Sequence, residues 1–117
     1  MIKNKTGVWG EIYVARYLRN SKCEILGSNY VCRFGELDIV AREGRTLCFI
    51  EVKTRNVKTR FRPMEAVDES KRKKLEMAAK SFVSAFGFDG PMRFDVCEVY
   101  VDDNDTLVDI NHIKNAF

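Results

Sequence analysis

The spacing of apolar residues predicts two helices in this chain. Over residues 8–18 apolar side chains recur at every third or fourth position, which predicts a helix that Thr6 caps and that ends near Ser21. A second stripe of this kind covers residues 75–86 and predicts another helix, for which Gly87 is a suitable end.

Five further segments show the pattern of β-strands, with apolar residues between turn residues. They are residues 24–32, 36–43, 46–54, 93–101 and 107–113. Gly44 and Arg45 predict a tight hairpin between the second and third of these strands. After the hairpin, an irregular connection of about ten residues ends at Pro63, where the second helix follows, and loops of this length are more often functional.

The element order α, β, β, β, α, β, β predicts an α/β fold. The third strand, the second helix and the fourth strand form a crossover, which we expect to be right-handed and to give at least one parallel pair. The chain has 117 residues, 45% hydrophobic and 32% charged, which suffices for one packed core. We therefore expect a single domain over residues 1–117, with a mixed sheet flanked by helices.

The sequence argues against a membrane-spanning or secreted protein, against disulfide bonds and against most histidine-dependent catalysis. No apolar run approaches the roughly 18 residues of a membrane span, and residues 1–5 lack the apolar stretch of a secretory signal, so we expect a cytoplasmic protein without a membrane partner. The four scattered cysteines are interpreted as reduced, buried thiols. The single histidine, His112, excludes most histidine-dependent catalysis and is interpreted as a hydrogen-bonded residue near the C-terminus.

Charge is unevenly distributed along the chain, although its net value is only +3. Residues 53–62 include five basic residues and no acidic one, whereas residues 95–109 include six acidic residues and no basic one. This pattern predicts one basic and one acidic side of the molecule.

The hairpin concentrates carboxylates on one face. If Gly44 and Arg45 form a two-residue loop, counting back along both strands places Asp38 opposite Glu51 and Glu36 opposite Lys53, all on one face of the sheet. The other face then collects a core of Leu37, Ile39, Cys48, Ile50 and Val52. Directly opposed like charges destabilise a pair, and Mg²⁺ or Mn²⁺ is the cation that carboxylate oxygens prefer.

The first helix contributes one more carboxylate. Glu11 falls inside its apolar stripe, where a carboxylate is costly unless it is paired or binds a metal, so we expect it to point at the same polar cluster. Phe49 shares the charged face and needs cover, which indicates that a helix packs over that face. The alternative is a ladder of alternating charges on a solvated face, with Glu11 at the border of its helix.

Two levels of resemblance follow from these residues. Asp38, twelve intervening residues and then Glu51-Val52-Lys53 resemble the Asp…(Asp/Glu)-x-Lys signature of the restriction-endonuclease-like nucleases, and the predicted order resembles their αβββαβ core. More closely, nearly the whole chain resembles the YraN family of small bacterial proteins. The segments that carry this resemblance are residues 10–15, 35–41, 49–55, 63–67 and 93–96.

The resemblance implies a metal site and a reaction. Asp38, Glu51 and the carbonyl oxygen of Val52 would bind Mg²⁺ or Mn²⁺, and Lys53 would polarise or position the attacking water. Glu11 matches a helix acid of the junction-resolving branch of these nucleases as an additional ligand, direct or through water. Glu36 matches an acidic position beside the motif. The chain departs from the family pattern at residues 60–62, where a glycine is expected after the phenylalanine.

The basic connection after the hairpin is a candidate surface for nucleic acid. Its cationic side chains could contact flanking phosphates and Phe61 could stack on an unpaired base, while the alternative is a solvated basic loop. The second helix adds Lys71 on its core side, either as a further contact or as a chain that only reaches out to solvent. The candidate contacts are Arg55, Lys58, Arg60, Phe61, Arg62 and Lys71.

Together these features predict a Mg²⁺- or Mn²⁺-dependent endonuclease, a hydrolase that cuts phosphodiester bonds in structured or single-stranded DNA. One alternative is a nucleic-acid-binding module with this fold but without useful catalysis. Another is an adaptor in a DNA-processing assembly. A symmetric cut in a duplex or junction would require a homodimer, and no segment identifies a dimer surface.

Overall fold

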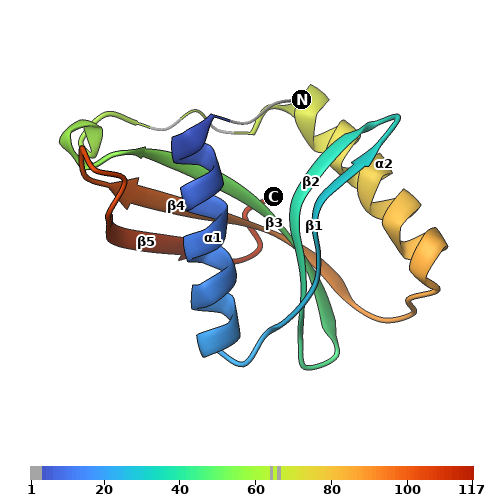
Figure 1. Ribbon diagram of the computed structural model, residues 1–117. Coiled ribbons are helices and arrows are strands. Elements are labelled where there is room, and N and C mark those ends of the chain that lie inside the picture. Colours follow the sequence, from blue (N-terminus) through green and yellow to red (C-terminus); the bar gives the residue numbers. More distant parts are fainter. Residues whose placement is uncertain (1–3, 64, 66) are drawn as a thin grey trace.

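The computed structural model describes residues 4–63, 65 and 67–117, which form a five-stranded mixed sheet flanked by two helices (Figure 1). The elements are α1 (Lys5–Asn20), β1 (Glu24–Cys32), β2 (Gly35–Glu43), β3 (Thr46–Asn56), a 3-10 turn (Val57–Thr59), α2 (Glu69–Phe86), β4 (Met92–Val101) and β5 (Leu107–Ile113). The sheet order is β1-β2-β3-β4-β5, with β3 and β4 parallel and the other neighbours antiparallel. This confirms the predicted fold class and is compatible with an αβββαβ core.

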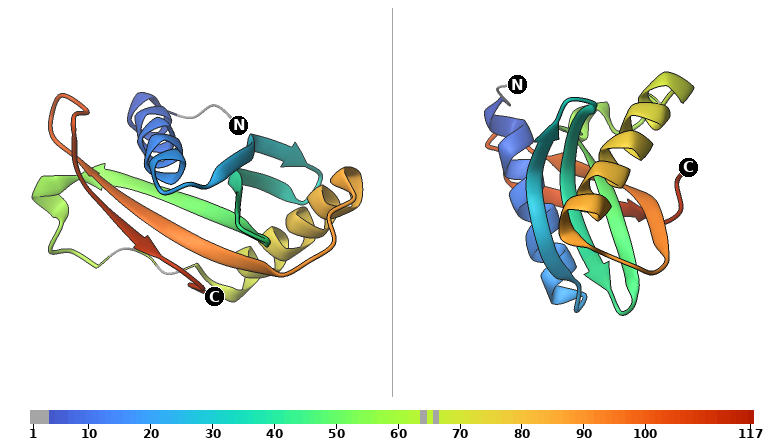
Figure 2. Two further views of the ribbon diagram at one scale, coloured as in Figure 1. Left: turned by 90° about the horizontal axis from the view of Figure 1, so that it is seen from below. Right: turned by 90° about the vertical axis from the view of Figure 1, so that its right-hand side faces the viewer.

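The two helices cover opposite faces of the sheet (Figure 2). On one face Val14 and Leu18 of α1 pack in a cluster with Ile39, Ile50 and Val99 of the strands. On the other face, α2 packs through its apolar stripe against a second cluster of strand residues, Val40, Leu47, Phe49 and Val96. Because side chains alternate along a strand, consecutive residues supply the two cores. Phe49 is covered by a helix as expected, and that helix is α2.

Both helices begin differently from the predictions. Asn4, not Thr6, caps α1, and its side-chain oxygen accepts a 2.7 Å hydrogen bond from the Gly7 amide. The Thr6 hydroxyl instead donates to Asp105 in the turn between β4 and β5, at 2.8 Å. Helix α2 begins at Glu69 because the side chain of Asp68 caps it, so the connection extends beyond Pro63. It ends as predicted at Gly87, which has a φ of 68°.

The hairpin opens part of the way along its length. Its register matches the prediction from Glu43 opposite Thr46 to Ile39 opposite Ile50, and there the pairing of β2 with β3 stops. Beyond this point β2 stays paired with β1, while β3 stays paired with β4 to Asn56. The predicted cross-strand pairs of Asp38 with Glu51 and of Glu36 with Lys53 are therefore wrong.

The parting of β2 from β3 also changes the hydrophobic cluster to which Leu37 belongs. Leu37 packs in the α2-side cluster rather than with Ile39 on the α1 side, because β2 no longer follows β3 at this point. The other predicted members of that face, Cys48, Ile50 and Val52, do contact the α1-side cluster. Among these residues the prediction was wrong only for Leu37.

A buried polar network joins the last turn of α1 to the sheet. Asp95 is 0% exposed and accepts hydrogen bonds from Arg93, His112 and the Asn115 amide. The other ring nitrogen of His112 lies 2.9 Å from the Tyr17 hydroxyl. Burial opposes ionisation of Asp95, but the hydrogen bonds from His112, Arg93 and Asn115 outweigh it and lower the pKa of this carboxyl. His112 is thus hydrogen-bonded, as predicted.

All four cysteines are free thiols, and three of them are buried while Cys32 is half-buried. Among the described residues, no helix is long and apolar enough to cross a membrane.

Candidate active site

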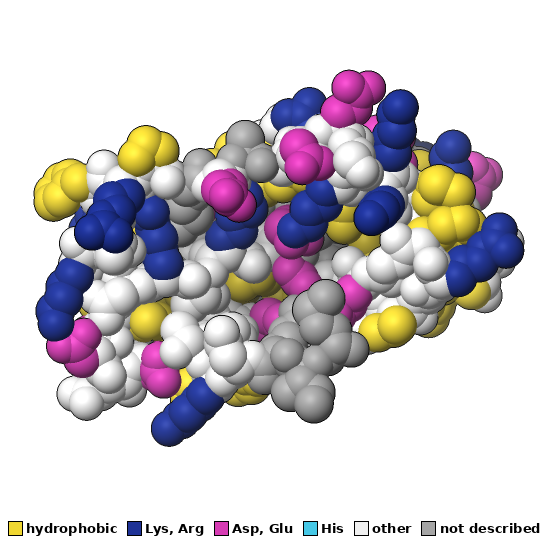
Figure 3. Space-filling model, turned by 90° about the horizontal axis from the view of Figure 1, so that it is seen from above, with side chains coloured by type: hydrophobic (Ala, Val, Ile, Leu, Met, Phe, Trp, Pro, Cys, Tyr) yellow, Lys and Arg dark blue, Asp and Glu magenta, His cyan; other side chains and the backbone are white. Residues whose placement is uncertain are grey.

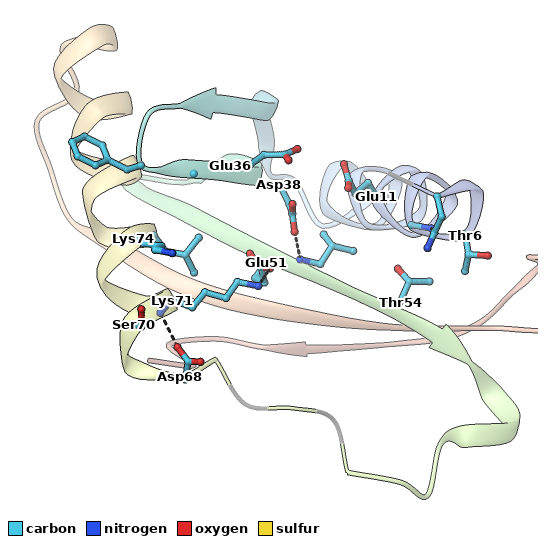
Figure 4. Close-up of a pocket in the computed structure, with 16 residues that line it drawn as sticks. Thr6, Glu11, Glu36, Asp38, Glu51, Thr54, Asp68, Ser70, Lys71 and Lys74 are labelled. Carbon is cyan, nitrogen blue, oxygen red and sulfur yellow. Dashed lines mark hydrogen bonds and ion pairs between the residues drawn. The ribbon is translucent and has the colours of Figure 1, made fainter. Parts of the chain in front are cut away.

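The space where β2 and β3 part is a pocket of about 720 Å³ (Figure 4). Acidic side chains gather in a hollow of this face of the molecule, and Lys and Arg side chains lie along one side of it (Figure 3). Four elements supply the polar side chains of its walls. These side chains are Thr6 and Glu11 of α1, Glu36 and Asp38 of β2, Glu51 and Thr54 of β3, and Ser70, Lys71 and Lys74 of α2, with the cap residues Asn4 and Asp68.

Gly10 brings α1 against the sheet at the edge of this pocket. A Cβ atom at Gly10 would lie 1.8 Å from Oγ1 of Thr54, so only glycine permits this approach. The next residue, Glu11, is 8% exposed and lines the pocket. The hydroxyl of Thr54 is itself buried and has no hydrogen-bond partner among the residues described.

Asp38 and Glu51 reach the pocket from adjacent strands. Asp38 is 8% exposed, and its Oδ2 accepts a 2.9 Å hydrogen bond from the Val52 amide. A side-chain contact to the backbone thus links β2 and β3 where their ladder has ended. Glu51 is also largely buried, and its Oε1 accepts a 2.8 Å hydrogen bond from Nζ of Lys71. The two acids are therefore each held by a different partner on a different element.

The donor set at this point suits a hard divalent cation. Asp38, Glu51 and the carbonyl oxygen of Val52 are oxygen donors, and Mg²⁺ is usually bound by one or two carboxylates together with waters. The buried hydroxyl of Thr54, which has no partner in the part of the chain that the structure describes, adds a further polar atom to the same walls. Within the described ranges, no three Asp, Glu, His or Cys side chains are grouped closely enough to hold a metal by themselves.

The two lysines expected near the site occupy different places. Nζ of Lys53 donates to the carbonyl oxygen of Glu65 and lies in a neighbouring pocket, not in the acidic one. Lys71 of α2 enters the acidic pocket instead. Burial opposes its charge, but the hydrogen bond and the charge of Glu51 outweigh burial and raise the pKa of Lys71. It is therefore a charged member of the site.

Lys74 is a basic residue of this wall that the sequence analysis missed, as are the polar residues Asp68 and Ser70. It lines the pocket three residues after Lys71, on the same face of α2. Its spacing from Lys71 was a usable signal, because residues three apart on a helix are neighbours.

The basic connection is largely tied to the acidic segment that follows β4. Lys58 pairs with Asp103, and Arg60 pairs with Asp109 at 2.7 Å. The predicted separation into a basic and an acidic side is wrong, because the fold brings these two charged segments together.

Aromatic contacts distinguish the remaining residues of the connection. The guanidinium groups of Arg55 and Arg60 both lie over the ring of Tyr100, and Arg55 also donates to the Arg60 carbonyl oxygen. Phe61, by contrast, is 96% exposed, and Arg62 beside it is exposed as well. Phe61 and Arg62 therefore project into solvent, as does Lys58, whose ammonium is paired with Asp103.

Comparison with known proteins relates the whole chain to one group. The model of the uncharacterised protein family UPF0102 matches residues 10–99. A UPF0102 protein of Caldicellulosiruptor saccharolyticus is 42% identical over 118 residues, which cover 100% of both chains. UPF0102 proteins of Moorella thermoacetica and Nocardia farcinica are each 39% identical, over 100% and 98% of this chain and 98% and 91% of their own.

Proposed function

Since the chain belongs to the uncharacterised protein family UPF0102, whose description specifies no activity, we propose its function from the acidic pocket: metal-dependent hydrolysis of phosphodiester bonds in structured or single-stranded DNA. The observation that carries this proposal is the meeting of Asp38 and Glu51 in one pocket, opposite a charged lysine. The same two acids supply the motif that resembles the restriction-endonuclease-like nucleases.

The proposed reaction uses the two walls of the pocket for different tasks. Asp38, Glu51 and the Val52 carbonyl oxygen would hold Mg²⁺ or Mn²⁺, which supplies a nucleophile at neutral pH and charge stabilisation for the departing oxygen. The Val52 amide orients Asp38, and Lys71 orients Glu51, so both carboxylates are positioned before a ligand enters. Such preorganisation contributes to rate because the groups need not reorient during the reaction.

The remaining acids and the exposed loop extend the proposed site. Glu11 and Glu36 line the same pocket and would hold waters around the cation. Phe61 and Arg62 project from the connection, where they would stack on an unpaired base and contact a phosphate. Lys53 can position the attacking water, as its motif implies, only if its ammonium leaves the Glu65 carbonyl oxygen.

Incubation with labelled substrates tests this proposal. The panel contains hairpin, flap, four-way junction and single-stranded DNA with their RNA counterparts, each in Mg²⁺, Mn²⁺ or EDTA. We expect cleavage of at least one DNA with a metal and none in EDTA, and loss of that cleavage in Asp38→Asn and Glu51→Gln. Cleavage that survives EDTA or both substitutions would refute the proposal. Tight binding without any cleavage would favour the nucleic-acid-binding alternative.

A further inference from the structure

We propose that α2, through Lys71 and Lys74, supplies the positive charge that contacts the substrate phosphate, and that Lys53 of the motif instead holds the connection before α2. This inference rests on the proposed function and specifies where the substrate strand lies: between the first turns of α2 and the open edge of β3. The sequence motif alone assigns the site lysine to position 53.

The position of Lys53 is the first observation. Its ammonium donates to the backbone carbonyl oxygen of Glu65, in the segment between the 3-10 turn and α2. The pocket that it lines, with Pro63 and Val67, adjoins the acidic pocket through Asp68 and Lys71 but contains neither Asp38 nor Glu51. Lys53 thus ties the backbone at Glu65 to β3.

The position of Lys71 is the second observation. Its backbone amide donates to the cap Asp68 at 2.8 Å, so the base of its side chain is fixed by the start of the helix. From there the chain reaches across the pocket to one oxygen of Glu51 (Figure 4). The side chain is 50% exposed, which leaves the ammonium accessible to an incoming anion. A phosphate oxygen would be a second acceptor within its reach.

The polarity of the pocket is the third observation. Carboxylates line the β2 and β3 side. Lys71 and Lys74 line the α2 side together with the cap residue Asp68, whose carboxylate accepts from the Lys71 amide. A phosphodiester accompanied by a cation has the complementary polarity, with the cation against the carboxylates and the phosphate oxygens against the ammonium groups. The positive end of the α2 dipole adds to the charge on the same side.

Helix α2 also provides matched controls. Lys73 and Lys80 lie on the same helix, each is exposed, and neither lines the acidic pocket. Lys73 instead pairs with Glu69 at 3.7 Å. Replacing either removes the same charge from the same helix and leaves the proposed contact intact.

The test measures binding and cleavage separately. A fluorescein-labelled oligothymidine strand in Ca²⁺ is titrated with wild type, Lys71→Met, Lys74→Met, Lys53→Met and the two controls, Lys73→Met and Lys80→Met. We expect Lys71→Met to weaken binding roughly tenfold and to lower the log-log salt slope by about 0.7, and Lys74→Met to act in the same direction. The two controls and Lys53→Met should change affinity less than about twofold. Lys71→Arg, which keeps the charge, should restore most of the binding.

The possible outcomes separate this inference from the nuclease proposal. If wild type binds the strand and Lys71→Met does not, but no substrate of the panel is cut, the nuclease proposal fails and the assignment of Lys71 stands. If substrates are cut and Lys71→Met matches Lys73→Met in binding and rate, the assignment is overturned while the nuclease proposal stands. A loss of binding in Lys53→Met alone would assign the phosphate contact to Lys53 of the motif and overturn the inference. Absence of binding by wild type would overturn the inference.

Discussion

Two groups of buried carboxylates lie toward opposite ends of α1, and they differ in what holds them. At the last turn, Asp95 is bound by His112 and Arg93, whose side chains are only 7% and 13% exposed. Toward the first turns, Glu51 is bound by Lys71, whose side chain is 50% exposed. An acid whose partners are themselves buried is a structural part of the fold, because the loss of any one of these groups leaves an unpaired charge buried in the interior. An acid held by a half-exposed lysine can exchange that partner for a ligand.

The largest effect that we expect is a loss of stability when the buried Asp95 is removed. Asp95→Ala should lower the free energy of unfolding by about 3–5 kcal/mol, because it leaves His112 and Arg93 without their shared buried acceptor. Urea unfolding at neutral pH measures this change. Glu24→Ala, which removes an exposed ion pair with Arg42, is the control and should cost at most about 1 kcal/mol. Similar small losses for both variants would show that the Asp95 network does not stabilise the fold.

At the other end of the helix, the expected effect is on activity. Asp38→Asn should reduce metal-dependent cleavage by about 10²–10³-fold, because a negatively charged ligand is lost from the proposed cation site. Its melting temperature without metal should stay the same or rise, since a buried negative charge is removed and the amide oxygen can still accept from Val52. Wild type should also gain about 1.4 kcal/mol when Mn²⁺ is tenfold above its dissociation constant, and Asp38→Asn should lose most of this gain. A destabilised variant and a wild type indifferent to metal would contradict the proposed site.

A smaller effect is expected where α1 meets β3. Gly10→Ala should cost about 1–3 kcal/mol, because the added Cβ would overlap the side chain of Thr54. The double variant Gly10→Ala/Thr54→Ala should recover part of this loss, since the clashing Oγ1 is removed. Thermal melting of the single and double variants gives the coupling energy. Simple additivity of the two substitutions would mean that the helix does not approach the strand this closely.

The smallest expected effect is on the pH dependence of stability. The pKa of Asp95 lies below its ordinary value of 3.8, because the hydrogen bonds of its network outweigh burial, and a hydrogen bond from Arg93 also lowers the pKa of Glu43. Both acids therefore contribute stability that is present above their ordinary pKa values and is lost as pH falls through the lowered ones. Glu43→Gln should flatten the acid limb of the stability curve measured from about pH 5 downwards. An unchanged limb would show that Glu43 does not take part.

The local pattern of the sequence was sufficient for the order of helices and strands, for the register of the closed part of the hairpin and for four acids that line the pocket, but not for the fifth, Asp68. It could not show that the ladder ends at Ile39, because counting along two strands assumes continuous pairing. The place of Lys71 depends on the start of α2, which Asp68 determines by capping the helix five residues beyond Pro63. The pairing of Lys58 with Asp103 depends on contacts between distant segments, which a count of charges along the chain does not contain.

The parting of β2 from β3 also has a consequence for the kinetics of local opening. Residues of β2 before Ile39 are paired along one edge only, whereas those after it are paired with strands on both sides. Backbone amides at positions 36–38 should therefore exchange their hydrogens with solvent faster than those at positions 40–42. Slower exchange at positions 36–38 on addition of Mn²⁺ would report that the two strands are being held together across the pocket. The bound ion would then control how far β2 and β3 part from one another at the pocket.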